Sequence, residues 1–253
     1  MTEQPILVNT DRRGVATVTL NRPEVNNAFN GAMLTALAEN FYRLGTDRKV
    51  RVVVLRGAGK HFSAGADLKA VREEEDRPDP MKVLRILDGL VKPTIALVQG
   101  ACIGGGVAWA AACDIVIAED SAFFSIPEVR IGFCPFPMIP LFLRGLGARA
   151  LRRYALTGER FAAAEALRLG LVSEVCPAGG LDAAAAAVID EALHGAPNAL
   201  EETKHIIAAC LEGSSDAEPH LLDAMFADAR ESAEAKEGVA AFRERRKPSW
   251  YPG

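Results

Sequence analysis

The sequence has no excess of basic residues and none of the glycine motifs that hold nucleotide phosphates. Its 253 residues carry a formal net charge of −4, which gives no general attraction to nucleic acid or to an anionic membrane surface. Neither GxGxxG nor a P-loop motif ending in lysine is present. These absences argue against a nucleic-acid-binding protein and a nucleotide-phosphate cradle. An anionic ligand would need local basic residues.

Metal-ligand motifs and paired cysteines are absent as well. The four histidines show no HExxH or similar spacing, so no metal site is expected. The N-terminal MTEQPILV lacks a charged segment followed by a long apolar one, so no signal peptide is expected. No CxxC pair occurs, and apolar neighbours predict buried, reduced thiols in a cytoplasmic protein. The five cysteines are Cys102, Cys113, Cys134, Cys176 and Cys210.

The segment from Thr94 to Ala118 could be mistaken for a membrane span, because it contains no Lys or Arg. It does contain Gln99, Asp114 and three consecutive glycines, and both of its ends have strand-like patterns. A buried strand–helix–strand unit therefore fits better, and no membrane association is expected.

Strand and helix patterns alternate through the first two thirds of the chain. Val52 to Leu55 is a continuous apolar run, typical of a strand that is buried on both faces. The alternation predicts an α/β core with a largely parallel sheet. The other elements expected there are hairpin strands at Ile6–Val8 and Val15–Leu20, helices at Gly31–Leu44 and Met81–Leu90, and a loop from Glu73 to Pro80.

The pattern changes after Pro137. Strand character fades, apart from Leu171 to Val175, and the sequence from Leu181 to Arg246 is almost wholly helical. Gly195-Ala196-Pro197 interrupts this helical part. We predict a core of residues 1–196 and a helical region of residues 197–253. Such a region commonly forms a subunit interface or covers an active site, and a plain helical bundle is the alternative.

Two stretches suggest a site. The strand-like run from Thr94 leads through Gly104-Gly105-Gly106 into a helix, an arrangement that presents unpaired backbone N–H groups to an anion. Glu128 follows Pro127 and offers a carboxylate base. An N–H donor and a carboxylate are the parts needed to stabilise an enolate and move a proton. Small residues between Gly57 and Lys69 mark a second place where the backbone can approach a ligand. Close packing and a surface carboxylate are the plainer alternatives.

Taken together, the motifs resemble the enoyl-CoA hydratase/isomerase (crotonase) superfamily over nearly the whole chain. The resemblance implies a crotonase-like (ClpP/crotonase) α/β fold, with a superhelical core of repeated ββα turns and a C-terminal helical trimerisation region. It also implies a homotrimer or a dimer of trimers. The motifs are Lys60-x-Phe62-Ser63-Ala64-Gly65-Ala66-Asp67-Leu68, Gly104-Gly105-Gly106, Cys113-Asp114-Ile115, Pro127-Glu128-x-x-x-Gly132, LTGERFAAAEALRLGLVSEV and the ending Phe242 to Lys247.

The resemblance implies an acyl-coenzyme A thioester as substrate, so that coenzyme A enters with the substrate and is no separate cofactor. By position, the peptide N–H groups of Ala66 and Gly105 would hold the thioester oxygen, with Glu128 as the acid/base. Phe242 and Arg245 would touch coenzyme A from a neighbouring subunit, and Lys69 is a further candidate for its nucleotide. The complete set of candidate substrate-binding residues is Ala64, Asp67, Leu68, Lys69, Ala108, Trp109, Phe133, Phe136, Phe242 and Arg245.

This chain departs from the family hydratases at one position. They place a glutamate two residues after the glycine triplet, where this sequence has Ala108. Water addition is served well by two carboxylates, whereas moving a proton between two carbons needs only one, here Glu128. Chains of the bacterial 3-methylglutaconyl-CoA hydratase branch resemble this one in having GGGV and a single such glutamate. We therefore favour hydration. The alternatives are isomerisation, another enolate reaction such as decarboxylation or C–C hydrolysis, and non-catalytic acyl-CoA binding.

Two features suggest what the acyl pocket accepts. Trp109 stands beside the missing glutamate and could occupy the vacated space. After Gly132 the chain continues Phe133-Cys134-Pro135-Phe136-Pro137-Met138-Ile139-Pro140, whose two aromatics and three prolines predict a rigid apolar wall with most of its residues in the core. Such a wall favours a branched or bulky apolar acyl group over a charged one.

Overall fold

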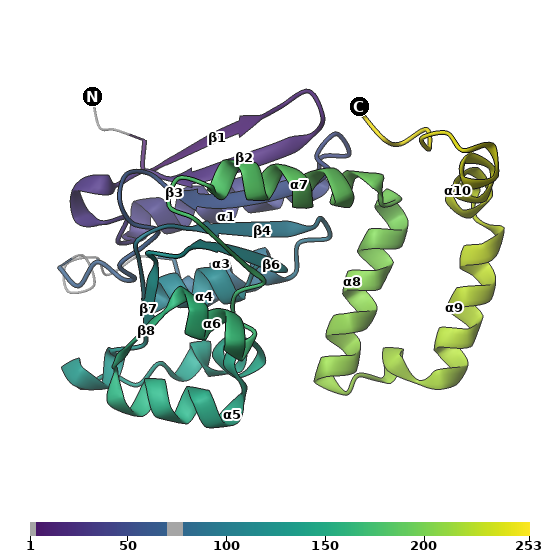
Figure 1. The fold of residues 1–253 in the computed structure, drawn as a ribbon. Helices are drawn as coiled ribbons and strands as arrows, with labels where there is room; N and C mark the ends of the chain where they lie inside the picture. The colour runs from purple at the N-terminus through teal and green to yellow at the C-terminus, as the bar shows by residue number, and fades with distance from the viewer. Residues whose placement is uncertain (1–3, 70–77) are drawn as a thin grey trace.

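The computed structural model describes residues 4–69 and 78–253 (Figure 1). Most of the predicted loop from Glu73 to Pro80 lies outside the described residues, and a helix begins at Pro80 itself. The main sheet has six strands in the order β1-β2-β3-β4-β6-β9, parallel except for the β1–β2 hairpin, which confirms the predicted largely parallel sheet. These strands are β1 (Ile6–Thr10), β2 (Val15–Leu20), β3 (Val52–Gly57), β4 (Thr94–Val98), β6 (Ile115–Glu119) and β9 (Glu174–Cys176).

A second, smaller sheet has the order β5-β7-β8 and was not predicted. Its strands are β5 (Ala101–Ile103), β7 (Phe123–Ser125) and β8 (Arg160–Ala162). Strands of three residues are too short to show a period in the sequence. The chain passes from β4 to β5 through Gln99 and Gly100, and this change of sheet brings Gly104 to the end of the small sheet.

The apolar strands of the main sheet are buried because both faces are covered. Val53 and Leu55 of β3 belong to the core on one face, and Val52 and Val54 belong to the core on the other. The first core includes residues of α1 (Gly31–Thr46), α3 (Pro80–Asp88) and α4 (Gly105–Ala111), and the second includes residues of α7 (Leu181–His194). Burying a Val or Leu side chain contributes about 1.5–3 kcal/mol, so this two-sided packing supplies much of the stability.

The chain between β7 and β9 forms the lower part of the molecule in Figure 1. It contains the single-turn helices η2 (Glu128–Ile131) and η3 (Phe136–Met138), then α5 (Ile139–Thr157) and α6 (Ala163–Leu169). Helix α5 is interrupted at Gly147, whose φ of 70° and ψ of 162° are not helical. The predicted strand at Leu171 to Val175 is displaced, since β9 begins only at Glu174.

Two of the five cysteines are not buried as predicted. Cys102, Cys113 and Cys176 are buried, whereas Cys134 and Cys210 are exposed. Apolar neighbours in sequence did not reveal this, because Cys134 lies on a surface segment and Cys210 on an outward face of a C-terminal helix.

The remaining helices form what we call the C-terminal arm, residues 197–253, which stands beside the core (Figure 1). They are α8 (Pro197–Glu212), α9 (Pro219–Glu231) and α10 (Ala233–Glu244), with the single turn η4 (Ser215–Ala217). In the part of the chain that the structure describes, no helix combines the length and the apolar character needed to cross a bilayer. The division at residue 196 stays a prediction.

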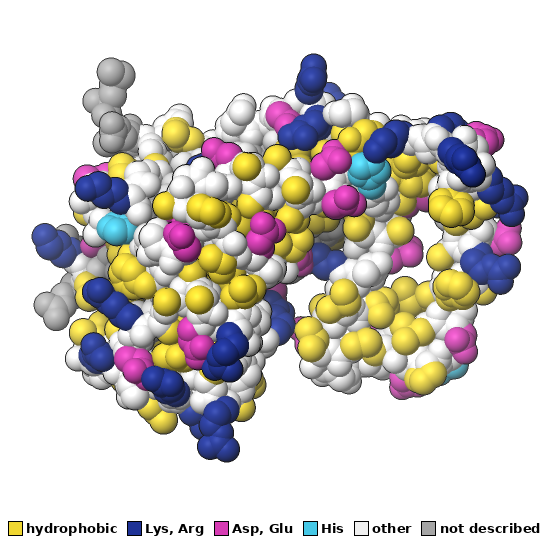
Figure 2. Space-filling view, viewed as in Figure 1, with side chains coloured by type: hydrophobic (Ala, Val, Ile, Leu, Met, Phe, Trp, Pro, Cys, Tyr) yellow, Lys and Arg dark blue, Asp and Glu magenta, His cyan; other side chains and the backbone are white. Residues whose placement is uncertain are grey.

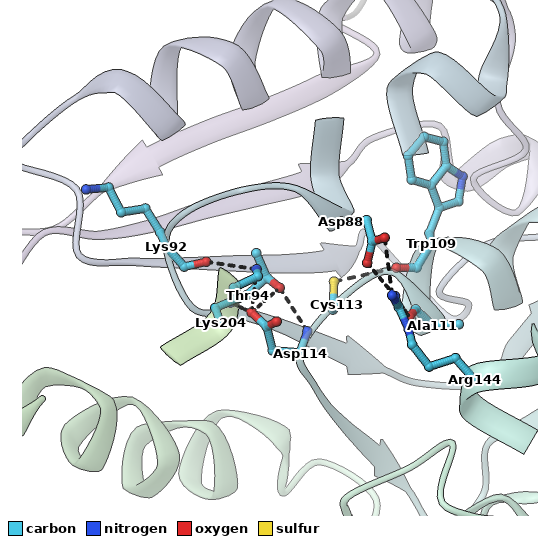
Figure 3. Close-up of polar contacts among 9 residues, drawn as sticks. All are labelled: Asp88, Lys92, Thr94, Trp109, Ala111, Cys113, Asp114, Arg144 and Lys204. Atoms are coloured by element: carbon cyan, nitrogen blue, oxygen red, sulfur yellow. Dashed lines mark hydrogen bonds and ion pairs between the residues drawn. The ribbon is translucent and has the colours of Figure 1, made fainter. Parts of the chain in front are cut away.

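A polar cluster joins the arm to the main sheet (Figure 3). Asp114 Oδ2 accepts hydrogen bonds from the backbone N–H and the hydroxyl of Thr94, at 2.7 and 2.8 Å. The Lys204 ammonium on α8 donates to the same oxygen at 2.8 Å and to the Lys92 carbonyl at 3.2 Å. The cluster therefore links the starts of β4 and β6 to the first helix of the arm.

Candidate active site

The first potential oxyanion donor lies where β5 meets α4. Gly104 has φ 55° and ψ −118°, a backbone conformation that favours glycine. Its carbonyl accepts from the N–H groups of Val107 and Ala108 at 2.9 and 3.3 Å. The N–H of the same peptide belongs to Gly105, the first residue of α4, and has no protein acceptor within the described residues. This N–H is thus available to a ligand, as expected at a helix N-terminus.

The second potential donor is held in the same way. The Gly65 carbonyl accepts from the Phe29 N–H at 2.8 Å, and the Phe29 carbonyl accepts from the Asp67 N–H at 2.9 Å. Between them, the Ala66 N–H has no acceptor in residues 4–69 and 78–253. The N–H and C=O of a trans peptide point in opposite directions, so fixing the Gly65 oxygen aims the Ala66 N–H away from Phe29.

The two donor loops meet at a pair of glycines. Gly65 has φ 84°, and a Cβ added there would lie 3.1 Å from the Gly105 nitrogen and 2.8 Å from the Ile103 carbonyl oxygen. No ordinary side chain fits at such a distance. Glycine at position 65 therefore permits the close approach of the two loops that each carry an unpaired N–H.

Glu128 begins η2 directly after Pro127, and its carboxylate lies against the first donor loop. A Cβ added to Gly104 would be 2.6 Å from Glu128 Oε1. Glu128 Oε2 is enclosed and has no hydrogen-bond partner among residues 4–69 and 78–253. Burial raises the pKa of this carboxyl above its usual value, because desolvation disfavours the charged form. A buried, unpaired carboxylate with a raised pKa is typical of a group that moves protons.

The structure therefore brings Glu128, Ala66 and Gly105 together, from segments more than 20 residues apart in the sequence. Arg130 holds η2 in place, because its Nε donates to the Thr157 carbonyl at 2.9 Å. The roles of Glu128, Ala66 and Gly105 stay predictions, but their convergence is what an enolate-stabilising site requires.

An aromatic pair lies behind the first donor. Ala108 and Trp109 are both buried in α4, and the Trp109 ring meets the Phe29 ring edge to face, with centroids 5.8 Å apart. The Phe29 ring also covers Gly105, where an added Cβ would be 2.5 Å from it. In Figure 3 the Trp109 side chain points away from the polar cluster around Asp114. Helix α4 itself contains no Asp or Glu that could replace the carboxylate missing at Ala108.

The residues around Ala66 separate into anchored and exposed ones. The Ala64 N–H donates to the Asn26 carbonyl at 2.9 Å, which fixes the loop. Asp67 Oδ2 is 3.1 Å from both terminal nitrogens of Arg22, so its charge is already compensated. Leu68 is 51% exposed and Lys69 is exposed, which leaves both side chains free to meet a ligand at the surface.

The prediction that most of the segment after Gly132 is core was wrong. Phe133 and Phe136 are 56% and 75% exposed, and within residues 133–137 only Pro135 is buried. The prolines shape this segment into η3 on the surface, directly after η2, and the Phe133 N–H donates to the Glu128 carbonyl at 3.0 Å. The two aromatic rings can therefore flank an approach to Glu128, but they do not fill the interior.

Phe242 and Arg245 are not near the other candidates in this chain. They lie at the end of α10, which Figure 1 shows on the opposite side of the molecule from α4. Phe242 is 86% exposed, and Arg245 ends the helix with φ 54°, an uncommon conformation for a residue with a Cβ. Any contact of theirs with a ligand at Glu128 would have to come from another subunit.

Sequence reasoning missed Arg22 and Phe29. Neither residue was among the candidates. Nothing in the sequence pairs Arg22 with Asp67, 45 residues away. Across residues 4–69 and 78–253, no three His, Cys, Asp or Glu side chains are grouped so as to hold a metal ion.

Known proteins are similar to this chain in sequence and structure along nearly its full length. The profile of the enoyl-CoA hydratase/isomerase family matches residues 10–252. Pseudomonas aeruginosa AtuE is 35% identical in sequence, superimposes with a TM-score of 0.91, and the match covers 98% of this chain and 99% of that one. The short-chain-enoyl-CoA hydratase of Clostridium acetobutylicum is 34% identical over 92% of each chain. The mevalonyl-coenzyme A hydratase sidH of Aspergillus fumigatus is 33% identical over 99% of this chain and 96% of its own.

These matches confirm the fold that the motifs implied, a crotonase fold with a C-terminal helical region. The chain belongs to the enoyl-CoA hydratase/isomerase family.

Proposed function

We propose that this enzyme adds water across the double bond of a 2-enoyl-coenzyme A thioester, with Glu128 as the acid/base. One observation carries the proposal: the enclosed, unpaired carboxylate of Glu128 lies against the loop that ends in the free Gly105 N–H. The similarity to proteins named as hydratases supports hydration as the reaction.

A single carboxylate can complete the cycle. Ionised Glu128 takes a proton from water while the water oxygen bonds to C3. The electrons of the double bond move onto the thioester oxygen. The N–H groups of Ala66 and Gly105 stabilise that enolate, and losing one such donor typically costs about 2.7–4 kcal/mol. The protonated Glu128 then gives its proton to C2, which restores the carboxylate. Water has been added, and the enzyme is unchanged.

We propose that the acyl group is apolar and branched or bulky. Support comes from Phe133 and Phe136, whose aromatic rings lie exposed after η2, and from the buried rings of Phe29 and Trp109, which pack behind Gly105. The relatives differ in the substrates that their names state, a mevalonyl thioester in one case and short-chain enoyl thioesters in another. Relatives of this kind therefore leave the acyl chain to be decided by experiment.

Ala108 favours one competing reaction, the isomerisation of a 3-enoyl thioester. Without a second carboxylate on α4, Glu128 could take a proton from C2 and return it to C4. The same two N–H groups would hold the intermediate dienolate. Another enolate reaction, such as decarboxylation or C–C hydrolysis, and simple acyl-CoA binding are the further alternatives.

We also propose that the arm makes the subunit contacts of a homotrimer or of a dimer of trimers. In that assembly Phe242 and Arg245 would reach the coenzyme of a neighbouring subunit. Support comes from large apolar side chains that the arm leaves exposed (Figure 2): Ile207, Leu211, Leu221, Phe226, Val239 and Phe242.

A panel of 2-enoyl and 3-enoyl thioesters in heavy water tests the reaction. Loss of the conjugated chromophore, with deuterium gained at the α-carbon, would establish hydration. Growth of the chromophore from a 3-enoyl substrate would establish isomerisation and overturn the proposal. Binding without turnover of either kind would support the acyl-CoA-binding alternative.

A further inference from the structure

Arg22 closes a ring of contacts around the Gly65–Ala66 peptide. Its guanidinium donates to the Ala28 carbonyl at 2.7 Å and to Asp67 Oδ2 at 3.1 Å. Ala28 precedes Phe29, whose backbone N–H and C=O bind Gly65 and Asp67. The segments on both sides of Ala66 are thus tied to one side chain, while the Ala66 N–H itself stays unpaired within the described residues.

The position of Arg22 suits a fixed clamp better than a ligand-binding cation. Its side chain is 19% exposed and that of Asp67 is 17% exposed, so both charges are largely withdrawn from solvent. Asn27, fully buried, holds the base of the clamp: its side-chain oxygen accepts from the Arg22 N–H at 2.9 Å. A guanidinium presents its donors in a rigid fork, which lets it bridge a carbonyl and a carboxylate at once.

The clamp acts on the direction of one N–H bond. Phe29 holds the Gly65 oxygen, which aims the Ala66 N–H and also polarises it, because hydrogen bonds in a chain strengthen one another. If the segment at Ala28 and Phe29 shifts, both the aim and the polarisation of the donor change. A misplacement of about 1 Å can lower a rate by about 100-fold.

We propose that Arg22 is a positioning residue, which through Ala28, Phe29 and Asp67 fixes the peptide whose N–H stabilises the substrate enolate. This inference rests on the proposed function, since it assigns the Ala66 N–H to the thioester oxygen. Arg22 lies outside the proposed catalytic set, and its role differs from that of the basic residues proposed to bind coenzyme A.

An aryl-conjugated 2-enoyl thioester tests the clamp by absorbance. Donors on the thioester oxygen draw electron density from the aryl group and move the absorbance maximum to the red. In Arg22→Ala we expect this red shift to be half that of the wild type or smaller. The kcat should fall to about one tenth of the wild-type value or below, and KM should change less than threefold. Millimolar guanidinium should restore part of the shift, and methylammonium should not.

The controls separate the possible failures. Arg56→Ala removes an arginine that pairs with Asp182 elsewhere and should leave the shift intact. If Arg22→Ala does not fold, Arg22→Lys keeps the charge beside Asp67, loses the fork and should give an intermediate shift. A full shift with a raised KM in the Arg22 variants would overturn the clamp and make Arg22 a ligand-binding residue. No shift in the wild type would overturn the proposed donor role of Ala66, and the clamp with it.

Discussion

The active-site region and the C-terminal arm treat apolar side chains in opposite ways. Helix α4 buries Trp109, Val107 and most of its other residues within this chain, and α1 buries Phe41 and five more. In the arm, α9 buries none, α8 only Ala209 and α10 only Ala241. Figure 2 shows hydrophobic side chains gathered at the surface where α8 and α9 approach each other.

The difference indicates that a single chain forms the complete active-site geometry but leaves apolar surface of the arm uncovered. The donors and Glu128 are held by hydrogen bonds and packing inside the chain, so their geometry does not depend on a second subunit. The arm offers large apolar surfaces, which on soluble proteins commonly mark interfaces. We therefore expect changes at the site to affect chemistry and not assembly, and changes in the arm to affect assembly and the binding of the coenzyme.

The largest expected effect is on the site side of this comparison. Glu128→Gln keeps the shape of the side chain but cannot accept a proton, and we expect turnover to fall by about 10²–10⁴-fold. Binding of a saturated acyl-coenzyme A should change little. Glu191→Gln, at an exposed position on α7, is the control. Turnover near the wild-type rate in Glu128→Gln would remove Glu128 from the mechanism.

The next effect tests whether the arm serves the coenzyme. We expect Arg245→Gln to raise the KM of a coenzyme A thioester by about 3–10-fold, a modest factor because solvent screens an exposed pair. The rate at saturation should not change, and a pantetheine thioester, which lacks the nucleotide, should not respond. Arg243→Gln removes a neighbouring exposed charge and is the control. Equal losses with both thioesters would indicate a structural role at a subunit contact.

The next effect concerns assembly, where the measured mass of a trimer would fall threefold on dissociation to monomers. Phe226 is 69% exposed on α9, so Phe226→Asp should spare the folded chain and place a charge in the proposed contact. Light scattering after size exclusion should show the mass falling from an oligomer to a monomer. Tyr42→Asp, at a position on α1 that is 70% exposed, is a matched control. If only the control dissociated, the contact would lie on α1 instead of the arm.

The smallest effect concerns stability and pH. Burial raises the pKa of Glu128 above 4.5, so the folded chain holds this proton more tightly than the unfolded chain does. The stability that this group contributes is complete below pH 4.5 and is lost as the pH rises through the folded-state pKa. Near neutral pH, Glu128→Gln should therefore melt at a higher temperature than the wild type, because its neutral amide avoids the cost of burying a charge.

Melting curves at several pH values measure that difference. It should vanish in acid, where both side chains are neutral, and grow as the pH rises. A difference that stays constant across the range would show that the carboxyl is not desolvated in the folded state.

Features with a local signal could be predicted from the sequence. The uninterrupted run of β3 predicted a strand buried on both faces, and the helical pattern after Leu181 predicted the helices that follow. The glycine triplet and Pro127-Glu128 marked the candidate donor loop and carboxylate. Both could be recognised because glycines at a helix start can expose a backbone N–H, and a glutamate can act as a base.

Contacts between segments that are distant in the sequence could be seen only in the folded chain. A Cβ on Gly65 would lie 3.1 Å from the Gly105 nitrogen, and Arg22 pairs with Asp67; no periodicity in the sequence records either approach. The three-residue strands of the small sheet were equally invisible, since their pairing comes from the chain changing sheets after β4. Exposure followed the same rule: Phe133, Phe136 and Cys134 read as core but lie at the surface, because burial depends on what packs against a residue and not on the residue's own character.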